Sequence, residues 1–548
     1  MQFSDTGLYI EDEALGNFAR NTAASVEVSG RVSMKKYSAL ALRAMRSLRG
    51  AAHFLDPESG AARWLLDNRY VAEREARESA RTLTRSGRLP ALVGEKRPAA
   101  AECAGALISA GRGRLSEKRI RIFLTEYQRR RPLREKELWL FIPILKAELT
   151  LFLAAAVTAK DVSEEVLKNV FDSYRLLSQT DLSELMESVN RLDECLSRDP
   201  SGIYPKMDAE TRAAYRRETA RIAKRQRMSE TDAAKKAVEL AALDGNGHVG
   251  KFLFKKPLGR AGKKPNAGAY IAANVILTAF FTVLAGITLR SVFAALLAML
   301  PISEIVKNGL TLILTRVRPP RRIFRMDLKD GVPPEGRTVI VISALLASEA
   351  DGEKYAELIE DYRLLNRTAG DEVRFGILAD LTESQSEENE KDSAVISRAQ
   401  EAIERLERRY GGGFYLFLRG RELNSADGLY MGRERKRGAI RELVRLITGK
   451  SSTLKVLSGD GEWLSGVKYI LTLDADTRLT FDSAIELIGV ALHPLNAPVI
   501  SGGMVREGCG MIAPSVVPEL KGANRSDFAR IFAGLGGVDP YGSTASEL

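Results

Sequence analysis

Two aspartates one residue apart carry the strongest chemical signal in this chain of 548 residues. Asp474 and Asp476 follow the apolar run Tyr469–Leu473, which is typical of a β-strand, and precede Thr477 and Arg478. Where a strand breaks into a turn at the open end of a sheet, one carboxylate can hold a hard divalent cation and the other a ligand hydroxyl. A solvated acidic turn has the same spacing, so the functional reading depends on context.

Two further features supply that context. Asp380 ends the apolar segment Ile377–Ala379, where a carboxylate can accept hydrogen bonds from a base or a ribose. The segment Gly432–Gly438 has four cations in five successive positions at the predicted start of a helix. A helix amino end with adjacent cations suits a diphosphate, although an exposed basic helix start explains the same pattern. The candidate phosphate ligands are Arg435, Lys436 and Arg437.

The region after residue 330 alternates between strand and helix patterns. Strands are predicted over Thr338–Leu346, Val373–Leu378, Phe414–Leu418, Tyr469–Leu473 and Val499–Val505, and helices over Gly352–Arg367, Ser384–Tyr410, Arg433–Ile447 and Phe481–Leu492. This alternation predicts an α/β domain with a mainly parallel sheet and helices on both faces. Ligands bind such sheets beyond the carboxyl ends of the strands, where Asp380, Asp474 and Asp476 all fall.

The middle of the chain contains a predicted membrane segment over 265–316. Ala269–Leu289 has no charged residue and is close to the ~20 residues that cross a bilayer. Ser291–Leu300 is again apolar, but Pro301, Glu304 and Lys307 interrupt the pattern that follows. Two interpretations stay open: a second crossing whose two charges face protein, or a re-entrant or interfacial helix. The sequence therefore predicts one or two transmembrane helices.

Cations flank this segment on both sides. They are Lys251, Lys255, Lys256, Arg260, Lys263 and Lys264 before it, and Arg316, Arg318, Arg321, Arg322 and Arg325 after it. By the positive-inside rule, both ends of the segment are expected in the cytoplasm, as in a hairpin through the inner membrane. The α/β domain over 330–548 is then expected on the cytoplasmic side.

The first 250 residues show helical periodicity and no catalytic pattern. Helices are predicted over Lys35–Ala52, Ala62–Arg81, Ser116–Arg129, Arg134–Ala159, Ser163–Ser178 and Asp208–Leu243. Trp64 and Trp139 lie in apolar helical contexts and are predicted to be core residues. The amino-terminal region is therefore expected to be all-α.

Composition excludes several classes of protein. The net charge is +11, but the cations are dispersed among glutamates without interleaved aromatic residues, so we expect a lipid bilayer rather than nucleic acid as partner. Cys103, Cys195 and Cys509 are too few and scattered for a disulfide framework or a zinc cluster, which indicates a reducing compartment. Met1–Arg20 lacks the apolar core of a signal peptide.

Motifs along most of the chain point to one family. They are residues 466–479 and His493–Asn496 around the paired aspartates, Arg433–Gly438, Pro319–Arg322, Asp330–Gly331, Phe528–Arg530, Asp539–Tyr541 and Arg63–Asn68. In combination they resemble the glycosyltransferase module of the cyclic β-1,2-glucan synthases. The resemblance implies a membrane enzyme that takes glucose from UDP-glucose on the cytoplasmic side and adds it to a growing glucan.

The resemblance also implies roles for the candidate residues. In a GT-A-like (Rossmann-like) domain, Asp380 would contact the uridine, and Asp474 the ribose or sugar. Asp476, with Asp474 beside it, would bind the Mg²⁺ or Mn²⁺ that bridges the diphosphate. Lys436 and Arg437 would add positive charge to the same leaving group.

The chain also departs from the family pattern. The synthases are several times longer, and this chain stops at Leu548 inside the transferase module, so its GT-A-like sheet is expected to be incomplete. We expect the general base and the Gln-x-x-Arg-Trp-type acceptor motif beyond Leu548, and we assign no catalytic residue within the chain. Residues 510–515 also differ from the Gln-Pro-Arg of the family.

Two functions follow from this comparison. In the first, the chain is the amino-terminal part of an inverting, metal-dependent glucosyltransferase that needs a complementing carboxy-terminal polypeptide. In the second, it is a non-catalytic, truncated membrane protein that binds a nucleotide sugar weakly or serves assembly only.

Overall fold

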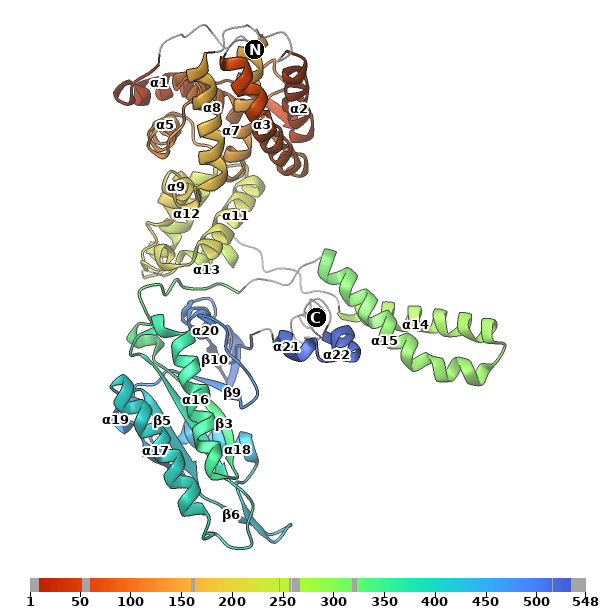
Figure 1. The fold of residues 1–548 in the computed structure, drawn as a ribbon, viewed down its shortest axis with the longest axis vertical. Helices are drawn as coiled ribbons and strands as arrows, with labels where there is room; N and C mark the ends of the chain where they lie inside the picture. Colours follow the sequence, from red (N-terminus) through yellow and green to blue (C-terminus); the bar gives the residue numbers. More distant parts are fainter. Residues whose placement is uncertain are drawn as a thin grey trace. The chain divides into compact units, whose positions relative to one another are not determined.

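A computed structural model describes the chain over residues 9–51, 60–158, 163–245, 247–255, 258, 267–317, 323–514 and 516–533. Several features of the sequence lie outside these residues: Lys256, Arg260, Lys263, Lys264, Arg318, Pro319–Arg322 and Asp539–Tyr541. The chain divides into two compact units, one of Met1–Pro205 with Arg212–Arg260 and one of Lys206–Thr211 with Ala261–Leu548. Each unit is described by itself (Figure 1).

The first unit is almost entirely helical. Its helices are α1 (Asp12–Ser25), α2 (Met34–Ala51), α3 (Gly60–Arg85), α4 (Ala99–Ala110), α5 (Glu117–Arg130), α6 (Glu135–Trp139), α7 (Phe141–Thr158), α8 (Glu164–Gln179), α9 (Ser183–Ser188), α10 (Arg191–Leu196), α11 (Ala209–Gln226), α12 (Glu230–Leu243) and α13 (Val249–Phe254). The strands β1 (Val28–Ser33) and β2 (Arg88–Leu92), separated in the chain by α2 and α3, pair as a two-stranded antiparallel sheet. The predicted all-α region therefore contains a small sheet that helical periodicity did not reveal.

Two predicted helices of this unit are each split in two. The predicted helix Arg134–Ala159 is interrupted at Leu140, between α6 and α7. Pro143 follows in the first turn of α7, the part of a helix where proline is tolerated because its missing N–H has no helical partner. The predicted helix Asp208–Leu243 breaks where Arg227 adopts a left-handed φ of 56° and Ser229 caps α12.

The two tryptophans of this unit differ in environment. Trp64 packs edge-on against Phe171, with 4.9 Å between the ring centroids, as expected for a core residue. Trp139 is 69% exposed, so the prediction that it lies in the core is wrong. It is the last residue of α6, and the break at Leu140 changes the helix face that the continuous pattern assigned to it.

Two long apolar helices form a hairpin in the second unit. They are α14 (Ala267–Leu289) and α15 (Val292–Val317), which runs through Pro301 without a break. The hydroxyls of Tyr270 and Thr311 join them at 2.9 Å. Among the described helices, α7, α14 and α15 are long and apolar enough to cross a membrane, but α7 is largely buried within the first unit. The second apolar segment is thus a full helix of 26 residues.

The rest of the second unit is an α/β fold around one five-stranded sheet. The strands are β3 (Thr338–Leu346), β4 (Val373–Leu381), β5 (Phe414–Arg419), β8 (Leu454–Ser458) and β9 (Tyr469–Asp474), in the order β8-β5-β4-β3-β9. The neighbours among β5, β4, β3 and β9 are parallel, and β8 is antiparallel to β5. The prediction of a mainly parallel sheet is therefore confirmed.

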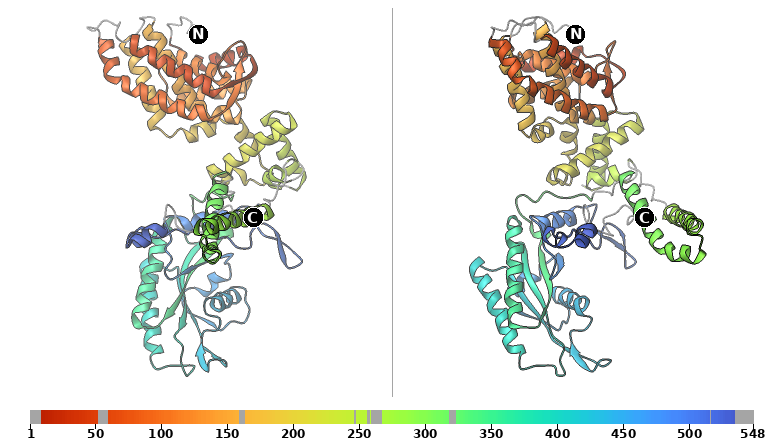
Figure 2. Two further views of the ribbon diagram at one scale, coloured as in Figure 1. Left: turned by 90° about the vertical axis from the view of Figure 1, so that its right-hand side faces the viewer. Right: turned by 45° about the vertical axis from the view of Figure 1, so that its right-hand side comes forward.

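Helices cover both faces of this sheet (Figure 2). One core joins the sheet to α16 (Glu349–Leu365), α17 (Asp392–Tyr410) and α20 (Ser483–Leu492). A second core on the other face joins it to α18 (Arg435–Ile447) and α19 (Gly461–Leu464). Because β3 is buried on both faces, its sequence is a continuous apolar run rather than an alternating one.

Two predicted elements of this unit differ from the structure. The helix predicted from Ser384 begins only at Asp392. The buried guanidinium of Arg421 holds the intervening residues in an irregular loop, because it donates to the Thr382 carbonyl at 2.7 Å and to the Asp392 carboxylate at 2.8 Å.

The predicted strand Val499–Val505 is also wrong. It is an antiparallel hairpin of β10 (Val499–Ser501) and β11 (Met504–Glu507), outside the main sheet. Gly502 and Gly503 have φ values of 61° and 73°, as the tight turns that favour glycine require. A similar small hairpin, β6 (Glu422–Asn424) with β7 (Leu429–Met431), follows β5.

Candidate functional site

The strand order places a topological switch point between β3 and β9. The chain passes from β3 to β4 and β5 toward one edge, and β9 then pairs with the opposite side of β3. In open α/β sheets, ligands bind outside the carboxyl ends of the strands at such a point. Asp474 is the last residue of β9, and its register partner on β3 is Ser343. The paired aspartates therefore begin at the switch point.

Asp474 and Asp476 lie on a tight turn that leaves the sheet. The Thr477 amide donates to the Asp474 carbonyl at 2.9 Å, which closes the turn, and both carboxylates are exposed. No group of three or more histidine, cysteine or acidic side chains among the described residues is arranged to hold a metal ion. Carboxylate oxygens are of the ligand type that Mg²⁺ and Mn²⁺ prefer, together with phosphate oxygens and water.

The structure brings Lys436 to this turn from α18. Its ammonium group lies 2.7 Å from Asp474 Oδ1, and the two side chains are 57% and 58% exposed. Exposed ion pairs of this kind contribute only about 0–1 kcal/mol, so the pair is easily exchanged for other partners. One carboxylate of the pair thus carries an internal cation that a bound ligand can replace.

Asp380 is engaged by an arginine that the sequence analysis did not identify. Arg419, at the end of β5, donates from Nε to Asp380 Oδ1 at 2.7 Å and from a terminal nitrogen to Oδ2 at 2.5 Å. Its side chain is only 4% exposed. The signal in the sequence was an arginine directly after the apolar run Phe414–Leu418, just as Asp380 directly follows the apolar run Ile377–Ala379. Arg419 and Asp380 are register partners on the neighbouring strands β5 and β4.

Arg419 also holds the basic turn that leads into α18. It donates to the backbone carbonyls of Arg433 at 2.7 Å and Arg435 at 3.0 Å. Glu434 and Arg435 have left-handed φ values of 56° and 45°, a conformation that is costly for residues other than glycine. The two hydrogen bonds from Arg419 to these carbonyls therefore stabilise a strained turn that positions Lys436.

Glycine is required on both sides of this turn. A Cβ atom on Gly432 would lie 2.4 Å from a terminal nitrogen of Arg419, and one on Gly438 would lie 2.0 Å from the Arg433 carbonyl oxygen. Both positions are too close for any side chain. The two glycines of the Gly432–Gly438 segment thus permit the backbone to approach Arg419.

The other predicted phosphate ligands point to local partners. Arg435 pairs with Glu383 at 2.6 Å, and Arg437 lies 3.7 Å from Glu434 with most of its side chain exposed. Asp380 and Asp474 lie near the ends of strands that flank β3, opposite Leu345 and Ser343, so their backbones are about 12 Å apart at ordinary strand geometry. The structure thus joins Lys436 directly to Asp474. Arg419 joins Asp380 to the turn that leads into α18 and carries Lys436.

A polar cavity of about 220 Å³ adjoins Arg419 on another face of α18. Its lining includes Arg433, Arg441 and Arg445 together with Ser452 and Thr453. Lys436 and the paired aspartates are not among the lining residues. The cavity and the aspartate turn therefore lie along different faces of the same helix.

The carboxyl end of α16 fixes the chain that follows the aspartates. The Tyr362 hydroxyl donates to the Thr477 carbonyl, and the Asn366 side chain accepts from the Ala484 amide at 3.0 Å. The Asp482 amide donates to the α16 residue Leu365 at 3.0 Å. Burial raises the pKa of Tyr362 to about 12, so its hydroxyl remains a donor at neutral pH. These contacts hold residues 477–484 against α16.

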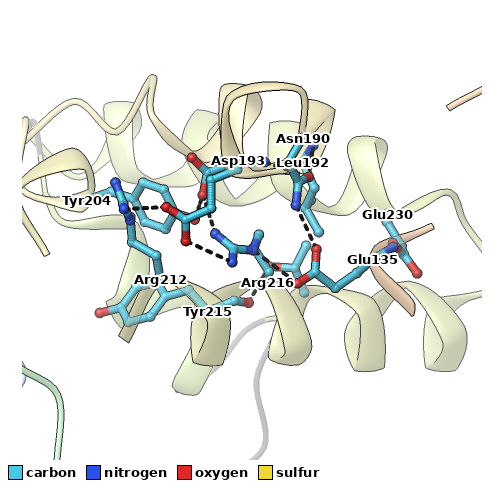
Figure 3. Close-up of polar contacts among 11 residues, drawn as sticks. Glu135, Asn190, Leu192, Asp193, Tyr204, Arg212, Tyr215, Arg216 and Glu230 are labelled. Carbon is cyan, nitrogen blue, oxygen red and sulfur yellow. Dashed lines mark hydrogen bonds and ion pairs between the residues drawn. The ribbon is translucent and has the colours of Figure 1, made fainter. Parts of the chain in front are cut away.

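A second charged cluster lies in the helical unit (Figure 3). The buried guanidinium of Arg216 donates to Glu135 at 3.0 Å and to Asp193 at 2.6 Å. Asn190 donates to the second oxygen of Glu135, and the Tyr204 hydroxyl donates to Asp193. These partners come from α6, α10 and α11, and they satisfy one another, so the cluster joins helices rather than presenting groups to a ligand.

Comparison with known proteins relates the chain to a glucan synthase. No protein-family model matches the chain. The cyclic beta-(1,2)-glucan synthase NdvB of Rhizobium meliloti (strain 1021) is 31% identical to the present chain over 424 residues. The match covers 70% of the present chain. These residues make up 15% of that protein, so the chain spans about a seventh of the curated relative that it matches. Together with the motifs around Asp474 and Lys436, this identity shows that the chain belongs to the cyclic β-1,2-glucan synthase family.

Proposed function

We propose that the chain binds the UDP-glucose donor of an inverting, metal-dependent glucosyltransferase that makes β-1,2-glucan. The observation that carries this proposal is the meeting of Asp474 and Lys436 at the switch point of a mainly parallel sheet. Carboxylates for a cation and an ammonium group for a phosphate are the groups that a nucleoside diphosphate sugar requires. The α/β unit is then a GT-A-like domain.

Asp474 and Asp476 would hold the Mg²⁺ or Mn²⁺ ion. When bound, such a cation supplies neutralising charge for the departing UDP. Lys436 exchanges its partner when Asp474 takes up a cation, and its ammonium group is then available to a phosphate oxygen. Arg435 and Arg437 add positive charge beside it. The turn held by Arg419 keeps these cations in place before the donor arrives.

The proposed nucleoside contact is Asp380. Arg419 donates one hydrogen bond to each of its oxygens, and each carboxylate oxygen has a second lone pair that can accept from a base or ribose. Arg419 restricts the rotation of this carboxylate. The pair therefore forms a rigid acceptor at the carboxyl end of β4.

The remaining partners are a membrane and a glucan acceptor. We propose that α14 and α15 anchor the chain in the inner membrane with the α/β unit in the cytoplasm, where UDP-glucose is available. Their exposed apolar side chains support this proposal. Attack of an acceptor hydroxyl on the anomeric carbon requires a general base, and we assign none of the described residues to that role.

Metal-dependent UDP binding tests the proposal. The full chain, purified in detergent, is titrated with UDP in the presence and absence of Mn²⁺ by isothermal calorimetry. Mn²⁺ is expected to strengthen binding by about tenfold or more, and Asp476→Asn is expected to remove that gain. Asp371→Asn is the matched control. Asp371 is exposed just before β4, at the amino end of the strand and therefore at the opposite end of the sheet from Asp476.

Equal affinity for UDP with and without Mn²⁺ would reject the metal role of the aspartates. Absence of any UDP binding would reject the donor site as a whole. The second function would then remain, in which the chain is a non-catalytic membrane protein that serves assembly only. If Asp476→Asn retained the effect of Mn²⁺ on UDP affinity, ligands other than Asp476 would have to bind the cation.

A further inference from the structure

An ion pair lies halfway along the second apolar helix. Glu304 and Lys307 are one turn apart on α15, and their charged groups approach to 2.6 Å. The helix spans Val292–Val317, so Glu304 is about 18 Å from its first residue at the 1.5 Å rise of an α-helix, and the helix is about 39 Å long. A spanning α15 therefore carries the pair near the centre of the bilayer.

The charged pair does not face the other helix of the hairpin. Ala295 and Val306 are the described α15 residues that are buried, and they mark the side that packs on α14. Glu304 and Lys307 remain 62% and 51% exposed, next to the exposed Asn308. The hairpin thus presents a polar patch of Glu304, Lys307 and Asn308 to its surroundings.

A hydrocarbon environment makes this patch costly. An ionised side chain at the centre of a transmembrane helix costs about 2.5–3.5 kcal/mol on insertion scales, and such residues nearly always face protein or water. The internal pair uses one of the three ammonium donors of Lys307 and leaves free lone pairs on Glu304. The remaining donors of Lys307 and acceptors of Glu304 favour a neighbouring helix at the same depth in the membrane. That helix would present an acidic group to Lys307 and a basic group to Glu304.

We propose that the partner is a second copy of this chain, with the two α15 helices packed in parallel through the polar patch. A two-fold axis places Glu304 of each copy opposite Lys307 of the other, so the patch is self-complementary. Helical side chains lean toward the amino terminus, which brings Lys307 down to the level of the facing Glu304. The pair would become a ring of four alternating charges.

The local packing supports this occupant. Leu297 and Leu300 precede the patch by one to two turns and, at 3.6 residues per turn, lie on the same side of α15 as Glu304 and Lys307. Both side chains are exposed and would supply apolar contact beside the charges.

Charge reversal in separate copies gives a direct test. The chain is labelled at its amino terminus with a donor or acceptor dye and reconstituted in lipid vesicles, and energy transfer between copies reports association. Glu304→Lys and Lys307→Glu each place like charges across the two-fold axis, so each variant alone is expected to self-associate about tenfold or more weakly. A mixture of the two variants restores both pairs and is expected to regain the wild-type signal. The matched control carries both substitutions in one chain and is expected to associate like wild type.

The proposal rests on membrane insertion of α14 and α15, and alkaline carbonate extraction measures that separately. Release of the wild-type chain by carbonate would overturn the anchoring, and the pairing with it. Retention in the membrane without energy transfer would overturn the pairing alone. Wild-type association of either single variant, or a mixture that fails to recover, would also overturn it. UDP binding is measured independently, so failure of the donor site is distinguishable from both.

Discussion

Lys436 shows how single residues decide the properties of the candidate site. Its helix alone would suggest an exposed basic surface, and the paired aspartates alone would suggest a solvated turn. The 2.7 Å contact between Lys436 and Asp474 joins these two segments, 38 residues apart, at one edge of the sheet. Under the proposed function, an ammonium group so placed would compete with a metal ion for Asp474 and would serve a diphosphate once the ion is bound.

Removal of the ammonium group is therefore expected to have opposite effects on two ligands. Lys436→Met should raise Mn²⁺ affinity without UDP by about twofold to fivefold, because Asp474 loses its competing cation. The same substitution should lower UDP affinity in saturating Mn²⁺ by about tenfold, because a charge-assisted hydrogen bond to phosphate is lost. Titration with Mn²⁺ followed by electron paramagnetic resonance, and calorimetry with UDP, measure the two constants. Lys450→Met, beyond the carboxyl end of α18, is the control. Parallel changes in both affinities would contradict the exchange of partners.

The elements of the chain depend on buried arginines that link them. Arg216 gathers carboxylates from α6 and α10 onto α11, and Arg421 ties the loop after β4 to the start of α17. Burial alone would lower the pKa of Arg216, but Glu135 and Asp193 beside it raise its pKa, so it stays charged. Loss of such an arginine leaves largely buried carboxylates without a counter-charge.

Arg216→Met is expected to destabilise the helical unit by about 3–5 kcal/mol, the usual cost of removing one partner of a buried ion pair. Urea unfolding followed by circular dichroism, with hydrogen exchange of α11 to identify the unit, measures the change. Arg217→Met removes an exposed neighbour on the same helix and should change stability by less than about 0.5 kcal/mol. Similar effects of the two substitutions would show that the cluster contributes little.

The loop over 382–391 is expected to open in acid. Hydrogen bonding from Arg421 lowers the pKa of Asp392 below its usual value of 3.8. Because the folded-state pKa is the lower one, the stabilisation is complete above about pH 4 and is lost as the pH falls through the folded-state value. Hydrogen exchange of the loop should therefore be constant from pH 7 to about 5, after correction for intrinsic rates, and increase below about pH 4. Asp392→Asn should remove this pH dependence, and its persistence would assign the effect to another group.

At the scale of the whole molecule, the sequence predicted the type of fold of each region better than it predicted the strand order and the ends of the elements. The alternation of Thr338–Leu346 and the later apolar runs with helical patterns was sufficient for a mainly parallel sheet, because buried parallel strands need continuous apolar residues. The long uncharged segment likewise identified α14. Strand order was not predictable, because no local pattern specifies which neighbour a strand selects.

The failures have local physical causes. β8 (Leu454–Ser458) is a short edge strand with polar residues, and its antiparallel pairing to β5 has no sequence signature. Residues Val499–Val505 have the composition of a strand, but Gly502 and Gly503 turn the chain within it. Arg419 was missed because its role depends on tertiary contacts with Asp380 and the α18 turn, which spacing alone does not reveal.

The contacts between α16 and the segment after the aspartates have a thermodynamic consequence. Tyr362, Leu365 and Asn366 immobilise residues 477–484 in the protein alone, so the conformational entropy of that segment is lost during folding rather than on encounter with a ligand. A preorganised loop leaves more of the interaction energy available as affinity. Recognition at this edge of the sheet should then resemble the docking of a ligand onto a rigid surface rather than coupled folding and binding.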